Sequence, residues 1–116
     1  MEQLPHVIQP DTYELKKDIE LKGKWNSDFF KNDHPIVLEL GCGKGEYSVE
    51  LAERYPEKNF IGIDIKGNRM WVGASDSHNK ELKNIAFLRI RIENIIKCFA
   101  ENEVSEIWIT FPDPQI

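Results

Sequence analysis

One stretch decides the fold of this chain: residues 37–46, with the sequence VLELGCGKGE. A short apolar run that contains one acidic residue is followed by Gly41, Gly43 and Gly45, an order typical of a buried strand that turns sharply into a helix. Glycine permits a positive φ and lets the backbone come close to a bound small molecule. We therefore expect a βα unit with a ligand at its turn.

The residues around these glycines indicate which kind of ligand binds. A dinucleotide fingerprint requires glycine or alanine three positions after Gly43, where this chain has Glu46. Glu39 and Glu46 repel a pyrophosphate, but they suit a ligand with an ammonium and a sulfonium, such as S-adenosyl-L-methionine. The stretch resembles motif I of the Rossmann-like S-adenosylmethionine-dependent methyltransferases. The alternative is a tight strand-to-helix connection in another α/β protein.

Size and composition limit the remaining possibilities. A chain of 116 residues, 41% hydrophobic and 30% charged, has the composition of one soluble globular domain. No apolar stretch approaches the roughly 20 residues that cross a bilayer. The first residues also lack the pattern of a secretory signal. We therefore expect a cytoplasmic protein with no membrane partner.

Charge and cysteine content argue against two further classes of protein. The net charge of −5 disfavours a free-standing nucleic-acid binder, because such binding depends on clustered lysine and arginine. Cys42 and Cys98 are too few for a disulfide framework or a zinc site, so we expect no metal. Cys42 is better interpreted as a small side chain that fills a tight turn than as a nucleophile.

The rest of the chain alternates between strand and helix patterns. Residues 1–35 are expected to form an N-terminal extension that packs on the domain, with Trp25, Phe29 and Phe30 as a small apolar cap; contact of these rings with a nucleic-acid base is the alternative. Strands are expected at 36–40, 59–64, 85–89 and 106–111, and helices at 44–55, 67–77 and 93–100. This order predicts an α/β fold in which a parallel sheet carries helices on both faces.

The second expected strand ends in an acid that completes the candidate site. Asp64 lies roughly 20 positions beyond the glycine loop, where nucleotide-binding α/β folds place the carboxylate that accepts hydrogen bonds from the ribose hydroxyls. A helix N-cap is the other interpretation of Asp64. Ligands in such folds bind at the carboxyl ends of the strands, so the glycine loop and Asp64 should converge there.

The last seven residues, TFPDPQI, carry a more specific resemblance. The two prolines fix φ on either side of Asp113. This element resembles the F-P-D-P motif of the tRNA (guanine-N7)-methyltransferases, although Gln115 and Ile116 replace the tryptophan and proline that usually follow. Together with the glycine loop and Asp64, the resemblance covers residues 36–116, and it implies the N-terminal half of a Rossmann-like methyltransferase domain, truncated after the fourth strand.

The resemblance implies a role for each matching residue. Glu39 would contact the methionine end of S-adenosyl-L-methionine, Asp64 the ribose, and Asp113 both the transferred methyl group and the target guanine. Family members usually have aspartate or asparagine followed by alanine after the third strand, where this chain has Arg91 and Ile92. The adenine contact would then come from the backbone at Arg91 or from Glu93.

The implied reaction transfers a methyl group from S-adenosyl-L-methionine to N7 of guanine in tRNA. Guanine N7 carries a lone pair and no proton, so the attack needs placement rather than a general base. In this family the basic tRNA-contacting residues lie beyond residue 116, so the fragment should be inactive alone. Its fourth strand would be an exposed apolar edge, and we expect the fragment to self-associate through that edge. A methyltransferase for another substrate and a non-catalytic nucleotide-binding module are the alternative functions.

Overall fold

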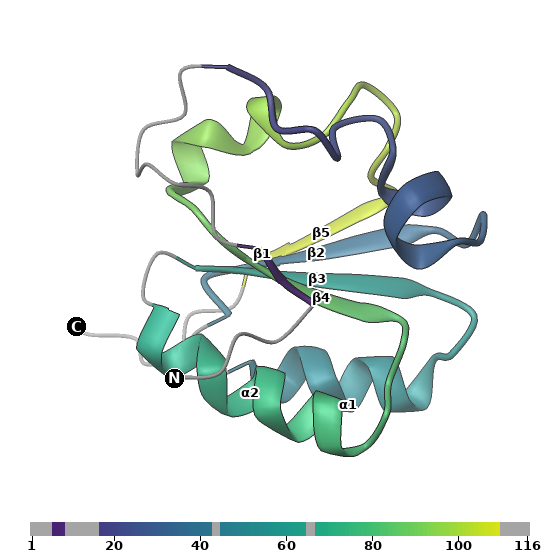
Figure 1. Ribbon diagram of the computed structural model, residues 1–116, viewed down its shortest axis with the longest axis vertical. Coiled ribbons are helices and arrows are strands. Elements are labelled where there is room, and N and C mark those ends of the chain that lie inside the picture. Colours follow the sequence, from purple (N-terminus) through teal and green to yellow (C-terminus); the bar gives the residue numbers. More distant parts are fainter. Residues whose placement is uncertain (1–5, 9–16, 43–44, 65–66, 110–116) are drawn as a thin grey trace.

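A five-stranded parallel sheet organises the residues that the computed structural model describes, which are 6–8, 17–42, 45–64 and 67–109 (Figure 1). The strands, in the order in which they lie side by side, are β1 (Val7–Ile8), β4 (Ile85–Arg89), β3 (Asn59–Asp64), β2 (Ile36–Leu40) and β5 (Glu106–Ile109). All four pairings between them are parallel. The first three expected strands have the predicted bounds; the fourth is described as far as Ile109, and residues 110–116 lie outside the described part of the chain.

Helices cover both faces of this sheet, as the sequence predicted. The helices α1 (Glu46–Arg54) and α2 (Gly67–Asn79) lie together on one face, and the short helices η1 (Trp25–Phe30) and η2 (Ile92–Lys97) lie on the other (Figure 1). Each face therefore has its own core. Because neither face of the central strands meets water, their sequences are almost continuously apolar.

Alternation along the strands divides the side chains between the two cores. Ile36 and Leu38 of β2 belong to the cluster beneath η1 and η2, whereas Val37 belongs to the cluster beneath α1 and α2. In β3, Phe60 lies on the α1 side and Ile61 on the η1 side. Successive residues of a strand point to opposite faces, so this alternation also fixes which polar residues at the strand ends share a face.

The third expected helix differs from the prediction. The sequence pattern favoured an α-helix over 93–100, but the structure has the 3₁₀ helix η2 over Ile92–Lys97. Its bonds span three residues: the Asn94 N–H donates to the Arg91 carbonyl at 2.9 Å, and the Cys98 N–H to the Ile95 carbonyl at 3.0 Å. The segment is rich in isoleucine, whose branched β-carbon loses rotamer freedom in an α-helix, and this favours a short, tighter turn.

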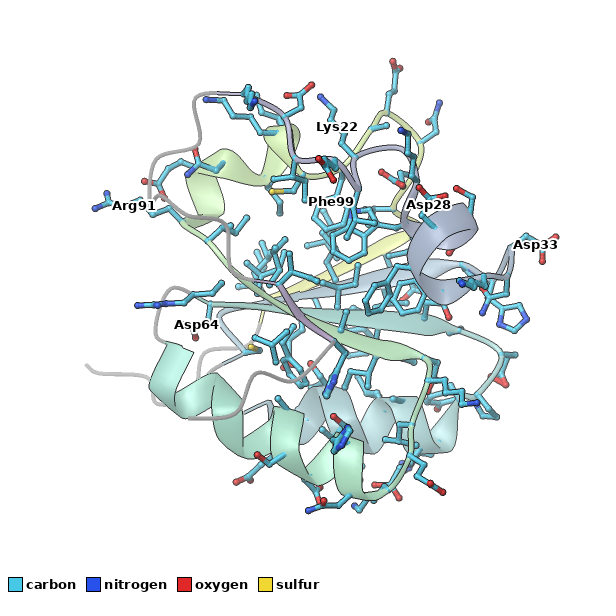
Figure 2. All side chains as sticks on the ribbon, in the orientation of Figure 1. Lys22, Asp28, Asp33, Asp64, Arg91 and Phe99 are labelled. Atoms are coloured by element: carbon cyan, nitrogen blue, oxygen red, sulfur yellow. The ribbon has the colours of Figure 1, made fainter. Side chains whose placement is uncertain are left out.

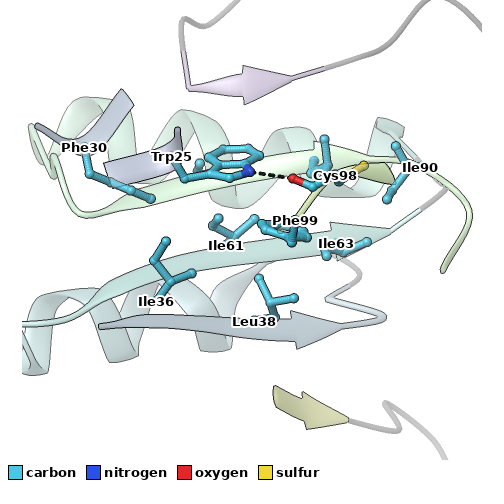
Figure 3. Packing of buried hydrophobic residues seen from close by; sticks show 11 residues of the cluster. Trp25, Phe30, Ile36, Leu38, Ile61, Ile63, Ile90, Cys98 and Phe99 are labelled. Atoms are coloured by element: carbon cyan, nitrogen blue, oxygen red, sulfur yellow. Dashed lines mark hydrogen bonds between the residues drawn. The ribbon is translucent and has the colours of Figure 1, made fainter. Parts of the chain in front are cut away.

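Aromatic side chains of the N-terminal segment are buried in the core. Trp25 has no exposed surface, and its ring stacks on Phe99 at a centroid separation of 5.3 Å. The indole Nε1–H donates to the carbonyl of Cys98 at 2.8 Å (Figure 3). Phe30 is 8% exposed in the same cluster. Trp25 therefore packs, as the sequence analysis favoured, and does not present its ring to a base.

The same segment is also held by its backbone. The Glu103 carboxylate accepts the N–H groups of Gly23 and Ala100 at 2.8 Å and that of Trp25 at 3.1 Å. Further towards the N-terminus, Val7–Ile8 adds the edge strand β1 beside β4, which the sequence analysis did not predict. A two-residue strand is too short to show a period of two, so its pairing depends on the neighbouring strand.

The opposite edge of the sheet is formed by β5, and its side chains are exposed. Ile107 is 57%, Trp108 42% and Ile109 61% exposed. Among the described strands, β5 pairs with β2 alone. This strand therefore presents an apolar edge, as expected. In the same described part of the chain, no helix has both the length and the apolar character needed to cross a membrane.

Candidate cofactor site at the carboxyl ends of β2 and β3

The glycine loop is built onto the end of the neighbouring strand. The N–H groups of Gly41 and Cys42 both donate to the carbonyl of Ile63 in β3, at 2.8 Å and 3.0 Å. The Gly45 N–H then donates to the Cys42 carbonyl at 2.9 Å, which closes the turn before α1. The predicted βα turn is thus present, and it is positioned by β3 as well as by β2.

Two of the three predicted glycines have the backbone conformation that requires glycine. Gly41 has a φ of 71° and Gly45 a φ of 77°, both in the left-handed region. Gly43 lies outside the described residues. At Gly45 a second constraint operates, because an added β-carbon would lie 2.5 Å from Cε1 of Phe87. The structure therefore explains Gly45 by the close packing of α1 on β4, whereas the sequence suggested an approach to a ligand.

Glu39 is a buried carboxylate next to this loop. It is 5% exposed and lies in register with Gly62 of β3 and Trp108 of β5. The hydroxyl of Ser48, in the first turn of α1, donates to its Oε1. Burial of a charged carboxylate is costly unless hydrogen bonds or an opposite charge compensate it. A carboxylate at this place is suited to a cationic ligand.

The Cys42 thiol is neutral and packs within the turn. Burial raises its pKa far above the ordinary range, and the negative charges of Glu39 and Asp64 raise it further. Its Sγ lies 3.1 Å from the place that a β-carbon on Gly62 would occupy. Cys42 therefore fills space beside a glycine, as the sequence analysis favoured, and its burial disfavours the thiolate form that a nucleophile requires.

Asp64 and Arg91 lie at the same edge of the sheet as the glycine loop (Figure 2). Asp64 ends β3 and is half-buried, and its carbonyl accepts the Ile90 N–H at 3.2 Å, which joins the ends of β3 and β4. Arg91 follows β4 with extended backbone angles and an exposed side chain. The structure thus brings Glu39, Asp64 and Arg91 to the end of the sheet formed by the carboxyl termini of its strands. Asp113 lies outside the described residues.

Ser48 is the residue of this site that the sequence analysis missed. It is 1% exposed and faces the sheet together with Val49 and Ala52. A hydroxyl between apolar positions on the inner face of a helix is an available signal, because a buried polar group requires a partner. The pattern alone does not show which partner that is.

The charges around the turn indicate the kind of ligand that suits it. The negative charges of Glu39 and Asp64 both raise the pKa of the Cys42 thiol, so the electrostatic potential at the turn is negative. The turn leads directly into α1, with Glu46 as its first residue, and this acid disfavours phosphate there. Within the described ranges, no three histidine, cysteine, aspartate or glutamate side chains form a metal-binding group. The described residues of the site therefore favour a ligand that carries positive charge.

Comparison with known proteins gives a family and close relatives. Residues 33–116 match the family model described as "Putative methyltransferase". The chain is 66% identical, over 99% of its length, to a tRNA (guanine-N(7)-)-methyltransferase of Christiangramia forsetii, of which it covers 52%. It is 60% identical over its whole length to the protein of the same name from Porphyromonas gingivalis, of which it covers 49%. The chain thus spans about half the length of these relatives.

Solved structures show the same fold at low sequence identity. The structure of an antibiotic-related methyltransferase superimposes with a TM-score of 0.68 at 20% identity, over 85% of this chain and 51% of that one. The bifunctional kinase-methyltransferase WbdD superimposes with a TM-score of 0.55 at 21% identity, over 84% of this chain and 26% of that one. These likenesses concern the arrangement of the sheet and its helices.

Proposed function

This chain belongs to the methyltransferase family whose model matches residues 33–116, and from that premise we propose that it is the cofactor-binding half of a tRNA (guanine-N7)-methyltransferase. The methyl donor of this family is S-adenosyl-L-methionine. The proposed reaction is the one for which two relatives are named, and these relatives are 66% and 60% identical to this chain over almost its whole length. The cofactor half is proposed because the residues suited to the cofactor lie within these 116 residues.

One observation carries the cofactor assignment: a buried carboxylate beside a glycine turn that is docked on the next strand. The Glu39 carboxylate accepts hydrogen bonds from the ammonium group at the methionine end, and the Asp64 carboxylate accepts hydrogen bonds from the ribose hydroxyls. The backbone turn at Gly41 and Gly45 supports this assignment, since its positive φ angles create the sharp entry into α1. Gly43, the third glycine of the motif, is assigned to the cofactor from the sequence pattern, since it lies outside the described residues. Arg91 borders the adenine region, with its backbone or Glu93 in contact with the base.

The chemistry assigned to the chain needs orientation more than acid–base catalysis. Guanine N7 attacks the sulfonium methyl with its own lone pair, and no proton has to leave N7. The base becomes cationic as the sulfonium loses its charge, so a fixed carboxylate stabilises the product side of the reaction. Asp113 supplies this carboxylate and also borders the transferred methyl group. Most contacts with tRNA are assigned to the part of the relatives that follows residue 116.

Calorimetric binding of S-adenosylhomocysteine to the 116-residue chain tests the cofactor assignment. We expect binding that is selective over NAD and that is weakened at least tenfold in the Glu39→Gln variant, since a hydrogen bond to a charged group contributes about 1.5 to 3 kcal/mol. Glu50→Gln is the matched control, because Glu50 is an exposed carboxylate of α1 paired with Arg54. Equal affinity for NAD, or an unchanged affinity in Glu39→Gln, would contradict the assignment.

The tRNA assignment is tested in a chimera. The chain replaces the matching half of the Christiangramia forsetii relative, and N7-methylguanosine in unmodified tRNA is measured by mass spectrometry after incubation with S-adenosyl-L-methionine. We expect methylation by the chimera, none by the isolated chain, and none by a chimera with Asp113→Ala that still binds S-adenosylhomocysteine. Full turnover in the Asp113→Ala chimera would refute the role of this residue.

The proposal includes self-association of the isolated chain through β5. An exposed edge strand pairs readily with a second strand, and the apolar side chains of Ile107 and Ile109 strengthen such a contact. Sedimentation should show a dimer that Ile107→Lys abolishes and that Ile96→Lys, 71% exposed on η2, leaves intact. A chain that stays monomeric at high concentration would rule this out. A tRNA substrate also supports a cytoplasmic location.

A further inference from the structure

Ser48 occupies an unusual place for a serine in the first turn of a helix. The residue that caps α1 is Gly45, which supplies no side-chain hydrogen bond to the helix. Ser48 lies three residues later, and its hydroxyl donates across the helix–sheet interface to Oε1 of Glu39 in β2. Ser48 is 1% and Glu39 5% exposed, so this hydrogen bond is sheltered from water. It joins the helix that follows the glycine turn to the strand that precedes it.

Glu39 lies in register with Gly62 of β3 and with Trp108 of β5. Gly62 of β3 has no side chain, and the space beside it is filled by Phe87 and Cys42. Trp108 of β5 donates its indole Nε1–H to Glu106 Oε2 at 3.0 Å. Hydrogen bonds to an ionised carboxylate favour its charged form and fix its direction. The hydroxyl of Ser48 therefore fixes the orientation of the Glu39 carboxylate.

We propose that Ser48 is a positioning residue, whose hydroxyl holds the buried carboxylate of Glu39 in the orientation that accepts the ammonium of the methyl donor. This inference rests on the proposed function, since it takes Glu39 as the contact of the methionine end. Ser48 itself does not touch the cofactor. Its effect is therefore confined to ligands that carry the ammonium group.

Two ligands separate positioning from general support of the fold. S-adenosylhomocysteine has the ammonium of the methionine end, whereas 5′-methylthioadenosine has the same nucleoside and a thioether but no amino acid group. If the role of Ser48 is purely structural, loss of its hydroxyl weakens the binding of both ligands alike. Positioning of Glu39 weakens S-adenosylhomocysteine alone.

The variants Ser48→Thr and Ser48→Val form a matched pair. Threonine and valine have the same shape, so any strain from the added methyl group is common to both, and only threonine keeps the hydroxyl. Ser48→Ala removes the hydroxyl without added volume and covers the case in which the larger residues fail to fold. Calorimetry gives the two affinities, and urea unfolding reports the stability of each variant.

For Ser48→Val and Ser48→Ala we expect S-adenosylhomocysteine to bind roughly tenfold to a hundredfold more weakly, the range for a hydrogen bond to a charged group. Binding of 5′-methylthioadenosine should change by less than about twofold, and Ser48→Thr should restore most of the lost affinity. Equal weakening of both ligands, or equal affinities of the threonine and valine variants, overturns the role of Ser48 while Glu39→Gln still tests the site. A parent chain that binds neither ligand overturns the proposed function and this inference together.

Discussion

Replacement of Gly45 by alanine should destabilise the chain strongly, because two independent costs meet at this residue. Gly45 has a φ of 77°, and an alanine in the left-handed region costs about 1 to 2 kcal/mol. The new β-carbon would also lie 2.5 Å from Cε1 and 2.9 Å from Cζ of the buried Phe87 ring. Overpacking of a core typically costs about 1 to 3 kcal/mol. The free energy of unfolding should therefore fall by about 2 to 5 kcal/mol.

Gly23→Ala is the matched control for this prediction. Gly23 has nearly the same φ, 78°, but among the described residues a β-carbon there would meet the β-carbon of Ala100, at an ordinary 3.6 Å. Its loss should be limited to the backbone cost of about 1 to 2 kcal/mol. The difference between the two variants measures the contact with Phe87 by itself.

Urea unfolding followed by circular dichroism measures both variants, with a common slope as the condition for comparison. Phe87→Leu in the Gly45→Ala background should recover part of the loss relative to the sum of the two single changes, since a smaller side chain relieves the clash. Gly45→Ala that is no more destabilising than Gly23→Ala, or strictly additive effects with Phe87→Leu, would refute the packing explanation of this glycine.

Three further predictions concern buried polar contacts and pH. Trp25→Phe should lower the free energy of unfolding by about 1 to 3 kcal/mol, because the buried Cys98 carbonyl loses its hydrogen-bond donor. Trp108→Phe, at the exposed edge strand, should change the free energy of unfolding little. Equal losses in the two variants, measured by urea unfolding, would contradict this prediction. Asn84→Ala should cost about 1 to 3 kcal/mol in thermal or urea unfolding, because its amide donates to three carbonyls at the end of α1 and beyond. Burial lowers the pKa of His6, so the unfolded chain binds this proton at a higher pH than the folded chain does, and the stability present above about pH 6.5 is lost as the pH falls. His6→Gln should therefore flatten the dependence of the free energy of unfolding on pH. An unchanged dependence in this variant would exclude His6 as its source.

The histidine prediction depends on a contact between distant parts of the chain. His6 precedes β1, and its Nε2 lies 3.0 Å from the carbonyl of Ala74 and 2.8 Å from the hydroxyl of Ser77, both in α2. Protonation does not remove a hydrogen bond to the carbonyl, but it places a charge in a half-buried site close to His78, whose ring stacks at 6.1 Å. The burial and the neighbouring histidine therefore both oppose the charged form, and burial is the larger cause.

From Ile36 to Ile109, the sequence by itself determined the order of the strands and helices, and it predicted the end of the sheet at which the candidate site lies. Buried parallel strands are apolar on both faces, so the strands at 36–40, 59–64 and 85–89 could be located to the residue. Glu39 and Asp64 could be placed together because parallel strands have their carboxyl ends at one edge. These features depend on local pattern and on a general rule of topology, which a single sequence contains.

Other features depend on residues that meet only after folding. Whether Gly45 makes room for a ligand or for a side chain depends on Phe87, which lies in another strand and forty-two positions away. The hydrogen bond from Ser48 to Glu39 depends on how α1 packs on β2, and the two-residue strand β1 is defined by its pairing with β4. Such contacts join residues that are far apart in the sequence, and they depend on how the helices and strands pack. The tertiary structure alone therefore decided them.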